Sequence, residues 1–388
     1  MNEKAASGQV KVAVVIPKYG LVGGAEGYAA ELTEQMAKNP RYAMHVFANR
    51  WQKESDKIQF HKVPILSFPK FLTTPSFAWL AGKRIKDGGF DLIHSHERIF
   101  HADLATLHSV PHRFWVRQIR NKRPNFYDVA TIQVEKIMMA DPRCHWYLPV
   151  SELAKTIHLQ EYPLDPTRVC VIHPGVHIEP FASPNGVESR HETRRLLSIG
   201  KEDLVMLFVS MNFELKGLDD LLEGMAALHA QGAGKTWSLL VVGKGNKAKY
   251  RALARKIGLE NKIFFAGVVP KQQLVSMYLA SDAFAMLSRF DTFGMAALEA
   301  MATGIPVMVS ANVGAKDIVR TGENGFVIEH TSDRNAVADC LVKLLDPALR
   351  SVMRQAALET ARNNSWEAAA AKMETLYEEV LRSKSGSA

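Results

Sequence analysis

Short runs rich in Val, Ile, Leu and Phe alternate along the chain with longer stretches of helical periodicity, which is typical of parallel sheets whose strands are joined by helices. The expected strands of the first half are Val10 to Ile16, Met44 to Ala48, Asp91 to His94, Leu104 to Leu107, Tyr147 to Val150 and Val169 to Ile172. Those of the second half are Val205 to Ser210, Ser238 to Val242, Ile263 to Ala266, Ala283 to Leu287, Pro306 to Ser310 and Phe326 to Ile328. A polar, turn-rich stretch, residues 180–195, separates the two series. The pattern therefore predicts an α/β fold of two doubly wound domains, with a ligand in the cleft between them at the carboxyl ends of the strands.

Length and composition agree with two α/β domains. The chain has 388 residues, 47% hydrophobic and 23% charged, which is long for one core and ordinary for a soluble globular protein. No apolar run reaches the roughly 18 residues of a membrane-spanning helix, and the first residues lack the character of a signal peptide. We therefore expect a cytoplasmic protein in which Cys144, Cys170 and Cys340 are reduced and buried.

The most informative segment is SRFDTFGMAALEAMA, from Ser288 to Ala302. It follows an expected strand, turns at Phe293-Gly294 and opens an apolar helix. The first turn of a helix has unpaired N–H groups, which can hold a phosphate or a polyhydroxylated ligand without a cationic side chain. Asp291 in the loop and Glu299 two turns into the helix add two carboxylates beside this anion site. Alone, such a D-x7-E pair is more often a capped helix without a ligand.

The neighbouring residues make the pattern specific. The run from Asp291 to Val307 reads D-T-F-G-M-A-A-L-E-A-M-A-T-G-I-P-V and resembles the E-x7-E signature of the retaining glycosyltransferases of family 4. Residues 313–327, VGAKDIVRTGENGFV, resemble the next segment of that family at the expected distance. The loop from Pro17 to Glu26, which ends in G-G-A-E, resembles the family's glycine-rich loop. The resemblance therefore covers the C-terminal half and extends to the other end of the chain.

This resemblance implies the GT-B fold, in which two Rossmann-like domains face each other across a cleft. Residues 1–185 would form the acceptor-side domain and residues 186–364 the domain that binds the nucleotide sugar. Residues 365–388 would form a C-terminal helix, capped by Ser365 and running from Trp366 to Arg382, that packs back on the first domain.

A sugar nucleotide leaves as a diphosphate, so the site needs groups that stabilise the departing negative charge. Gly23 and Gly24 precede an expected helix from Glu26 to Ala37 and let backbone N–H groups approach the phosphates. Lys216, in F-E-L-K-G, aligns with the family lysine that contacts the diphosphate.

Two departures from the family pattern affect the same site. The family commonly has an arginine a few residues before the lysine, but Ser210 to Leu215 contains no basic residue. Either Arg289 or another cation substitutes for it, or the leaving group is held less tightly. Asp291 stands where the family has glutamate, which keeps the charge and moves it by about one methylene.

The resemblance assigns the remaining donor contacts residue by residue. Glu299 would hydrogen-bond the ribose hydroxyls of the nucleotide. Main-chain groups near Val268 would read the base. The transferred sugar would be held by Asp291 and by N–H groups at the start of the helix, which belong to Thr292, Phe293, Gly294 and Met295.

A histidine is expected at the sugar from the first domain. The strand Leu104 to Leu107 and the residue after it resemble the T-x-H strand end from which family members point a histidine at the sugar. His108 is therefore the expected catalytic histidine, together with Lys216 and Asp291. The competing histidines, any of which could serve as acid, base or donor near neutral pH, are His94, His96, His101 and His112.

The implied reaction transfers a hexose, with glucose from UDP-glucose favoured and a GDP-sugar as alternative, to an acceptor hydroxyl with retention of the anomeric configuration. The transition state would resemble an oxocarbenium ion, and domain closure would exclude water. The chain contains no D-x-D sequence. We therefore expect no metal and no cofactor, with cations and helix N-termini holding the diphosphate instead.

The excess positive charge lies in the first half. Residues 1–180 contain 23 Lys and Arg against 17 Asp and Glu, which accounts for most of the net charge of +8. The densest stretch alternates five cations with apolar residues, which suits the surface of an anionic membrane as well as a basic helix packed on the protein itself. Its expected membrane or acceptor residues are Arg113, Phe114, Trp115, Arg117, Arg120, Lys122 and Arg123. This placement and S-x-N-F-x-x-K-G resemble the glucosyltransferases of the lipopolysaccharide core, so the acceptor is expected to be a glycan or a glycolipid.

Other functions fit the sequence less well. A sugar-nucleotide epimerase or glycoside phosphorylase on the same fold, and a noncatalytic sugar-nucleotide-binding module, stay open. Gly243 to Ala248 fits the weak G-x-G-x-x-A pattern of dinucleotide enzymes, but the next strand lacks the acidic residue that binds ribose. Gly234-Lys235-Thr236 precedes a strand, which excludes a P-loop. Despite a pI of about 9.2, the sequence contains no recognisable nucleic-acid-binding motif.

Overall fold

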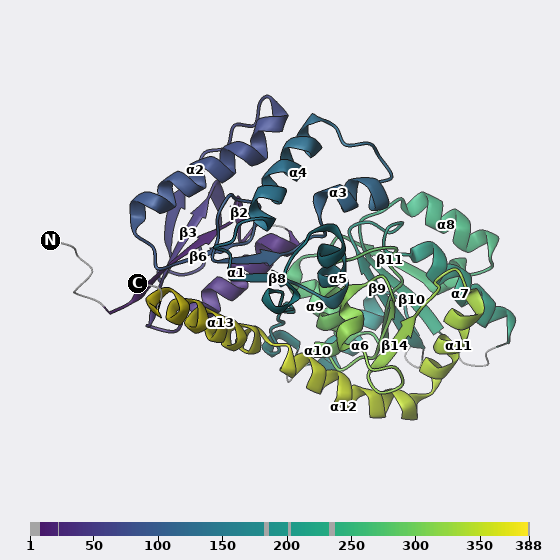
Figure 1. Cartoon of the computed structure of the whole chain (residues 1–388). Helices are drawn as coiled ribbons and strands as arrows, with labels where there is room; N and C mark the ends of the chain where they lie inside the picture. Colours follow the sequence, from purple (N-terminus) through teal and green to yellow (C-terminus); the bar gives the residue numbers. More distant parts are fainter. Residues whose placement is uncertain (1–7, 22, 182–185, 201–202, 233–236, 387–388) are drawn as a thin grey trace. The chain divides into compact units, whose positions relative to one another are not determined.

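The computed structural model describes residues 8–21, 23–181, 186–200, 203–232 and 237–386. The chain forms two compact units, Met1–Gly175 together with Trp366–Ala388, and Val176–Ser365 (Figure 1). Each unit contains a six-stranded parallel sheet. The predicted α/β class with two Rossmann-like domains is confirmed.

The sheet of the first unit is built from buried apolar strands. In sheet order its strands are β5 (Gln59–Lys62), β3 (Tyr42–Ala48), β1 (Val10–Val15), β6 (Leu92–Ser95), β7 (Leu104–Leu107) and β8 (Trp146–Pro149). Helices cover strands that are apolar on both faces, as parallel sheets require. The helices of this unit are α1 (Gly24–Met36), α2 (Thr73–Gly88), α3 (His112–Phe114), α4 (Phe126–Met139), α5 (Glu152–Glu161) and α13 (Trp366–Gly386), with shorter turns η2 (Lys70–Leu72), η3 (Trp115–Ile119) and η4 (Pro166–Arg168).

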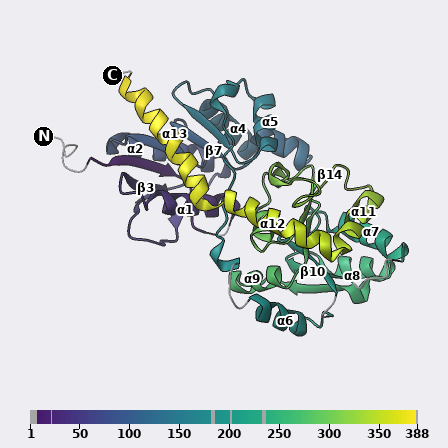
Figure 2. The same ribbon diagram turned by 90° about the horizontal axis from the view of Figure 1, so that it is seen from below.

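The C-terminal helix α13 belongs to the first unit, as predicted. It runs across that unit in Figure 2. Its Tyr377 hydroxyl lies 2.8 Å from Nδ1 of His94, and its Glu378 carboxylate accepts a 2.9 Å hydrogen bond from the Tyr42 hydroxyl. Near its end, Lys384 donates to the buried Asp103 at 2.7 Å. Polar contacts from Tyr377 to Lys384 therefore hold the second half of the helix on the first unit.

The second unit repeats the same architecture. In sheet order its strands are β11 (Ile263–Gly267), β10 (Trp237–Gly243), β9 (Leu204–Ser210), β12 (Ala283–Met286), β13 (Val307–Ser310) and β14 (Gly325–Ile328). Its helices are α6 (Gly186–Leu196), α7 (Leu218–Ala230), α8 (Lys247–Lys256), α9 (Lys271–Leu279), α10 (Met295–Ala302), α11 (Arg334–Leu345) and α12 (Pro347–Asn363), with short turns η5 (Glu179–Phe181), η6 (Glu260–Lys262) and η7 (Gly314–Ile318). The strand order reverses beside β9, so loops after β9 and β12 meet at the carboxyl edge, where ligands bind in doubly wound sheets.

One expected strand does not form. The segment Val169 to Ile172 runs beside β8 and donates two backbone hydrogen bonds to it, yet only Val169 pairs with Tyr147 as a bridge. In a parallel ladder the next donor from β8 would be the backbone nitrogen of residue 149, which is proline and has no N–H. The ladder therefore stops at Pro149.

Three short strands were not predicted. β2 (Lys18–Tyr19) and β4 (Arg50–Trp51) pair only with each other, and two residues give no periodic signal. β5 reads QFHK and lies at the edge of the first sheet. Edge strands are often polar, so they lack the apolar pattern by which buried strands are predicted.

The boundary between the units differs from the predicted one. The second unit begins at Val176, not at residue 186. Val176 already pairs with Ser365 and donates its N–H to the carbonyl of Asn364, both of which belong to the second unit. The chain therefore enters the second unit before the polar stretch that the sequence indicates as the separator, part of which, residues 182–185, lies outside the described residues.

In the described part of the chain, no helix is long and apolar enough to cross a membrane. Cys144 is buried, Cys170 and Cys340 are half-buried, and all three are free thiols. Gly234-Lys235-Thr236, the segment compared with a P-loop, lies outside the described residues.

Candidate functional site

The loop after β12 is fastened to the loop that carries Lys216. The Ser288 hydroxyl lies 3.0 Å from the carbonyl oxygen of Leu215, and the backbone N–H of Arg289 donates to the same carbonyl at 2.9 Å. Ser288 is fully buried, and its own carbonyl accepts from the Ser310 hydroxyl at 2.5 Å. Three strand ends are therefore tied together at the edge of the second sheet.

Gly217 allows this close approach. It lies at the start of α7 with a φ of +76°, in the left-handed region that favours glycine. A Cβ at this position would lie 1.9 Å from the carbonyl oxygen of Leu287. Only glycine fits here, which explains why Lys216 is followed by glycine.

Lys216 and Asp291 form an ion pair in the second unit. The Lys216 ammonium group contacts the Asp291 carboxylate, and the two side chains are 20% and 19% exposed. From the sequence, Lys216 was expected to bind the diphosphate and Asp291 the sugar. Their direct contact was not predicted. Because the Asp291 carboxylate already neutralises Lys216, a diphosphate can bind the Lys216 ammonium group only by competing with Asp291.

The turn before α10 has the predicted form. Gly294 caps the helix with a φ of +94°, and a Cβ there would lie 2.8 Å from Val313. The N–H groups of Gly294 and Met295 open the helix and have no acceptor within it, so they can face a ligand oxygen. Thr292 and Met295 are half-buried.

Phe293 differs from its expected role. Its backbone N–H donates to the Asp291 carboxylate at 3.1 Å, and its carbonyl accepts from Ala315 at 2.6 Å. The Phe293 N–H is therefore already used inside the loop, where it orients Asp291.

Glu299 has a partner that the sequence did not reveal. The hydroxyl of Tyr278, a fully buried side chain on α9, donates to a carboxylate oxygen of Glu299 at 2.7 Å. Burial raises the pKa of Glu299 above its usual value, while the hydrogen bond from Tyr278 and the charge of Lys271 act in the opposite direction. The tyrosine lies in an ordinary amphipathic helix, so nothing in its local sequence indicated this contact.

The cations at the carboxyl edge of the second sheet now include Lys244. Its N–H donates to the carbonyl of Ser210 at 2.9 Å, and Gly243 approaches that carbonyl so closely that a Cβ would lie 1.8 Å from it. Lys244 therefore follows the end of β10 beside the segment that lacks the family arginine. Arg289, the other candidate replacement, is exposed. Val268, expected near the base, is also exposed and follows Gly267 at the end of β11.

In the first unit, Gly23 caps α1, which begins at Gly24. Gly23 has a φ of +155°, and the side chain of Glu26 folds back to within 2.0 Å of the place a Cβ of Gly23 would occupy. Gly24 is exposed with open space around it. Both glycines are therefore exposed at the start of α1, and of the two only Gly23 has a backbone conformation and a close neighbour that exclude a side chain.

His108 follows β7 and lies in a cluster of rings. Its Nε2 is 3.0 Å from Nδ1 of His96, and the Tyr28 ring contacts it edge-on with 4.8 Å between centroids. Burial lowers the pKa of His108 to about 3. The imidazole is half-buried and neutral at physiological pH, so it serves as a hydrogen-bond donor or acceptor and not as a cation.

The competing histidines have other partners. Both ring nitrogens of the buried His94 are engaged, one by the Tyr377 hydroxyl at 2.8 Å and one by the Thr106 hydroxyl at 2.7 Å. His101 lies 2.7 Å from Asp141, and His112 lies 2.9 Å from Asp128. His96 is buried behind His108. His108, His101 and His112 are all partly exposed, and each uses one ring nitrogen in a contact with another side chain of the described residues. His108 is distinguished from the other two by its place at the end of β7, where the T-x-H pattern expects the histidine.

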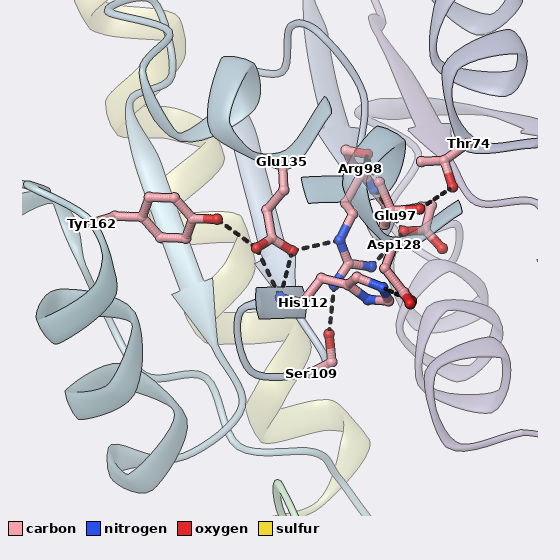
Figure 3. Close-up of polar contacts among 10 residues, drawn as sticks. Thr74, Glu97, Arg98, Ser109, His112, Asp128, Glu135 and Tyr162 are labelled. Carbon is pink, nitrogen blue, oxygen red and sulfur yellow. Dashed lines mark hydrogen bonds and ion pairs between the residues drawn. The ribbon is translucent and has the colours of Figure 1, made fainter. Parts of the chain in front are cut away.

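A buried polar network holds the segment that follows His108 (Figure 3). Glu135, which is 2% exposed, accepts from Arg98 at 2.5 Å, from the Tyr162 hydroxyl at 2.6 Å and from the His112 N–H at 2.9 Å. Arg98 also donates to the Ser109 hydroxyl at 3.1 Å. Burial acts against the Glu135 charge, but Arg98 and the other donors hold its pKa below the usual value. The sequence did not predict this network, because Glu135 lies in an otherwise ordinary helix.

The basic segment, residues 112–123, agrees only in part with its predicted role as a membrane or acceptor surface. It forms a short helix, α3, and a π-helical turn, η3, and its cations Arg113, Arg117, Arg120, Lys122 and Arg123 are exposed. Val116 is fully buried, and Phe114 and Trp115 are half-buried. The apolar side of the segment therefore packs largely on the protein, and Phe114 and Trp115 are not the free aromatic anchors that were expected.

In the described part of the molecule, no group of three or more His, Cys, Asp or Glu side chains is placed to hold a metal ion.

Comparisons with known proteins agree with this architecture. Residues 22–180 match the model of Glycosyltransferase Family 4, and residues 189–360 match that of Glycosyl transferases group 1. D-inositol 3-phosphate glycosyltransferase of Corynebacterium glutamicum is 34% identical over 230 residues, which cover 58% of this chain and 54% of that protein. The same enzyme of Actinosynnema mirum is 36% identical over 217 residues, 53% of this chain and 50% of the relative. The alignments thus span about half the length of these curated relatives.

Solved structures show the same fold. WaaG, a glycosyltransferase involved in lipopolysaccharide biosynthesis, aligns with a TM-score of 0.75 at 19% identity over 94% of this chain and 99% of its own. Sucrose-phosphate synthase from Thermosynechococcus elongatus aligns with a TM-score of 0.75 at 21% identity over 97% and 100%. The two family models together match most of the chain, and the solved structures have the same fold. The chain therefore belongs to the glycosyltransferases built from a family 4 domain followed by a group 1 domain.

Proposed function

We propose that this protein is a retaining glycosyltransferase that moves a hexose from a nucleotide diphosphate sugar to a hydroxyl of a glycan or glycolipid, without a metal ion. The observation that carries the proposal is the arrangement of Lys216, Asp291 and Glu299 around the N-terminus of α10. Lys216 and Asp291 are in contact beside the loop after β12, and Glu299 lies in α10, which that loop opens. We assign the diphosphate to Lys216, the sugar to Asp291 and the ribose to Glu299.

Each group has a defined task in this proposal. The diphosphate displaces Asp291 from Lys216 and takes the ammonium group as its counter-charge, with Lys244 or Arg289 as a second cation. The released Asp291 accepts hydrogen bonds from the sugar hydroxyls. The N–H groups of Gly294 and Met295 donate hydrogen bonds to the same sugar. Oriented donors at the place where charge develops lower the barrier to departure of the leaving group.

Other residues are assigned to the remaining parts of the donor: the ribose, the base, the phosphates and the sugar. Glu299 accepts from the ribose hydroxyls, and main-chain groups at Val268 meet the base. Gly23 and Gly24 let backbone N–H groups approach the phosphates, and His108 meets the transferred sugar. Because Tyr278 holds one oxygen of Glu299, the other is left to bind the ribose.

UDP-glucose is the proposed donor, with a GDP-sugar as alternative. The family resemblance favours it, and a protein of the same fold, Anabaena Alr3699/HepE, has been solved with UDP-glucose at a TM-score of 0.66. For the acceptor, WaaG is involved in lipopolysaccharide biosynthesis, whereas the curated relatives are named for D-inositol 3-phosphate. We propose a glycolipid of the lipopolysaccharide core, because the first unit presents a surface suited to a membrane.

That surface combines exposed aromatic side chains with cations. Phe68 and Phe126 are 89% and 84% exposed. Lys70 lies 5.2 Å from the ring centroid of Tyr127, so η2 and the start of α4 are adjacent. Arg120 of the basic segment lies 3.5 Å from Asp128 on the same helix. We call Phe68, Lys70, Phe71, Arg120 and Phe126 the aromatic–basic surface. Such a surface binds anionic lipid by charge and by insertion of its rings, which would place the protein at the cytoplasmic face of a membrane.

Transfer itself tests the proposal. UDP-glucose and GDP-hexoses are incubated in EDTA with delipidated core oligosaccharide, with core glycolipid and with inositol 3-phosphate, and the anomeric proton of the product is followed by NMR. We expect transfer from UDP-glucose to the core acceptors with the α configuration kept. An inverted product contradicts the retaining mechanism, and transfer only to inositol 3-phosphate contradicts the acceptor.

The same experiment separates the alternative functions. A sugar-nucleotide epimerase would consume the donor without any acceptor, and a glycoside phosphorylase would require free phosphate. A noncatalytic module would bind the nucleotide sugar and leave it intact. Glu299→Gln serves as the control, because it keeps the size of the side chain and removes the charge that accepts from the ribose.

A further inference from the structure

His96 and His108 form an imidazole pair behind the expected sugar-facing edge of His108. Nδ1 of His96 lies 3.0 Å from Nε2 of His108, and the ring planes are within 17° of each other. His96 is 5% exposed, and its other nitrogen, Nε2, is buried with no hydrogen-bond partner among the described residues. The backbone N–H of His96 donates to Val15 at 2.9 Å, which fixes the residue at the end of the sheet.

Both rings are neutral at physiological pH. Burial, together with the neighbouring histidines, lowers the pKa of His96 well below its usual value, and burial lowers that of His108 to about 3. In a pair of neutral imidazoles joined by one hydrogen bond, one nitrogen donates and the other accepts. The direction of this single bond therefore decides which nitrogen of His108 carries the proton.

The unpartnered Nε2 of His96 decides the direction. If His96 carried its proton on Nε2, a buried N–H would have no acceptor in the described part of the chain, and such donors are rare in folded proteins. If the proton is on Nδ1, it is donated to His108, and only a lone pair is left unpaired at Nε2. His108 then accepts at Nε2 and carries its own proton on Nδ1.

We propose that His96 is a positioning residue that holds His108 as the Nδ1–H tautomer, so that the ring edge directed away from His96 donates a hydrogen bond to an oxygen of the transferred sugar. The identity of that acceptor rests on the proposed function, whereas the tautomer does not. The edge contact with Tyr28 holds the same ring orientation. A neutral donor suits a sugar hydroxyl, because it adds no charge beside the departing diphosphate.

The test compares three variants of the full-length protein. His96→Phe keeps a ring and removes the donor, while His96→Asn places an amide N–H near the position of Nδ1. The chain offers a matched control in His45, which forms a second imidazole pair with His61 at 2.9 Å between the neighbouring strands β3 and β5. His45→Phe breaks the same kind of bond elsewhere in the same unit.

We expect 15N NMR of histidine-labelled protein to show a protonated Nδ1 and a bare Nε2 for His108, assigned by loss of the signals in His108→Gln. In His96→Phe this tautomer should no longer dominate, and kcat should fall about 10- to 100-fold, by analogy with the loss of a side chain that orients a metal-binding histidine. Nucleotide affinity should not change. His96→Asn and His45→Phe should both stay close to the activity of the unaltered protein.

Two results would overturn the inference. One is a His108 that carries its proton on Nε2 in the unaltered protein, and the other is a His96→Phe variant that loses no more activity than His45→Phe. If no nucleotide sugar is turned over by the unaltered protein, the proposed function fails, and the NMR spectrum still decides the tautomer by itself.

Discussion

Gly217 is the residue on which the geometry of the donor site most depends. Its backbone passes so close to Leu287 that a methyl group cannot fit, and its φ of +76° is one that alanine rarely adopts. The glycine therefore determines where Lys216 is held relative to the loop after β12.

Replacing Gly217 by alanine should destabilise the protein by about 2 to 4 kcal/mol, because steric overlap adds to the backbone penalty. Gly258→Ala is the matched control. Gly258 has a φ of +74° and nothing within 4 Å of its missing Cβ, so it carries the backbone penalty alone, about 1 kcal/mol. Urea denaturation of both variants measures the difference. Equal losses would show that the contact with Leu287 does not constrain the loop.

The ion pair between Lys216 and Asp291 predicts opposite effects on nucleotide binding. In Asp291→Asn the ammonium group no longer has a competing carboxylate, so UDP should bind at least as tightly as to the unaltered protein. In Lys216→Gln the counter-charge is lost, and UDP should bind about tenfold more weakly or worse. Hexose transfer should fall in both, by about 100-fold or more.

Calorimetric titration with UDP, beside the transfer assay, checks this pair. If Asp291→Asn weakened UDP binding as much as Lys216→Gln, the carboxylate would be supporting the phosphate site and not competing for its cation.

The sequence predicted these site residues singly and missed their partners. Lys216, Asp291, Gly294 and Glu299 lie within motifs whose spacing carries information. Tyr278 belongs to a different helix from the carboxylate it contacts, and such long-range contacts leave no local pattern in one chain.

At the scale of elements, the aromatic–basic surface is made by η2, the start of α4 and the basic segment. The sequence indicated only the basic segment, because its five cations lie close together within residues 113–123. No sequence pattern marks Phe68 and Phe126 as exposed, and only the structure shows that they are 89% and 84% exposed near the contact between Lys70 and Tyr127.

The double variant Phe68→Ser with Phe126→Ser should weaken binding to vesicles of phosphatidylcholine and phosphatidylglycerol. We expect about a tenfold loss for each phenylalanine, since burying such a side chain contributes about 1.5 kcal/mol or more. Cosedimentation measures it. Val352→Ser, which removes an exposed apolar side chain of the second unit, is the control.

Turnover of a delipidated acceptor should not change in the double variant. If the double variant and the unaltered protein bound the vesicles equally, the aromatic–basic surface would not be the membrane-binding surface. Loss of self-association in place of vesicle binding would identify it as an interface between copies of the chain.

The strands show that a strand with a continuous apolar run was predictable from the sequence, at the centre or at the edge of a sheet, and that a short polar strand was not. All six strands of the second sheet were predicted to within two residues, because their apolar runs are uninterrupted. Of the first sheet, five were predicted and β5 was not, because its sequence, QFHK, has no apolar run. The expected strand at Val169 failed because of a proline in its neighbour, which no property of the segment itself reveals.

At the scale of the whole molecule, the two units should respond differently to acid. Burial lowers the pKa of six histidines of the first unit, to about 4 for His45 and His158 and to about 3 for His94 and His108; the other two are His61 and His96. These histidines stay neutral in the folded state, while in the unfolded state they take up protons below about pH 6.5. Stability of the first unit should therefore fall as the pH falls from 6.5 towards 4.

Each of the fully buried histidines contributes up to about 2 kcal/mol of this loss at about pH 5. The paired carboxylates Asp128, Glu135 and Asp141, whose pKa values are lowered, add to it only at lower pH, as they become protonated. Hydrogen exchange followed by mass spectrometry at about pH 7 and about pH 5, corrected for intrinsic rates, should show loss of protection in the strands of the first unit. An equal loss in both units would contradict this assignment.

The central claim is that the second unit binds the nucleotide of a sugar donor through Lys216 and Glu299 without a metal. It is tested most directly by calorimetric titration of UDP-, GDP- and ADP-sugars in EDTA, with the unaltered protein and with Glu299→Ala. The account predicts binding of one nucleotide class, UDP, with affinity lost in Glu299→Ala. Absence of binding until a divalent cation is added, or full binding to Glu299→Ala, would contradict it.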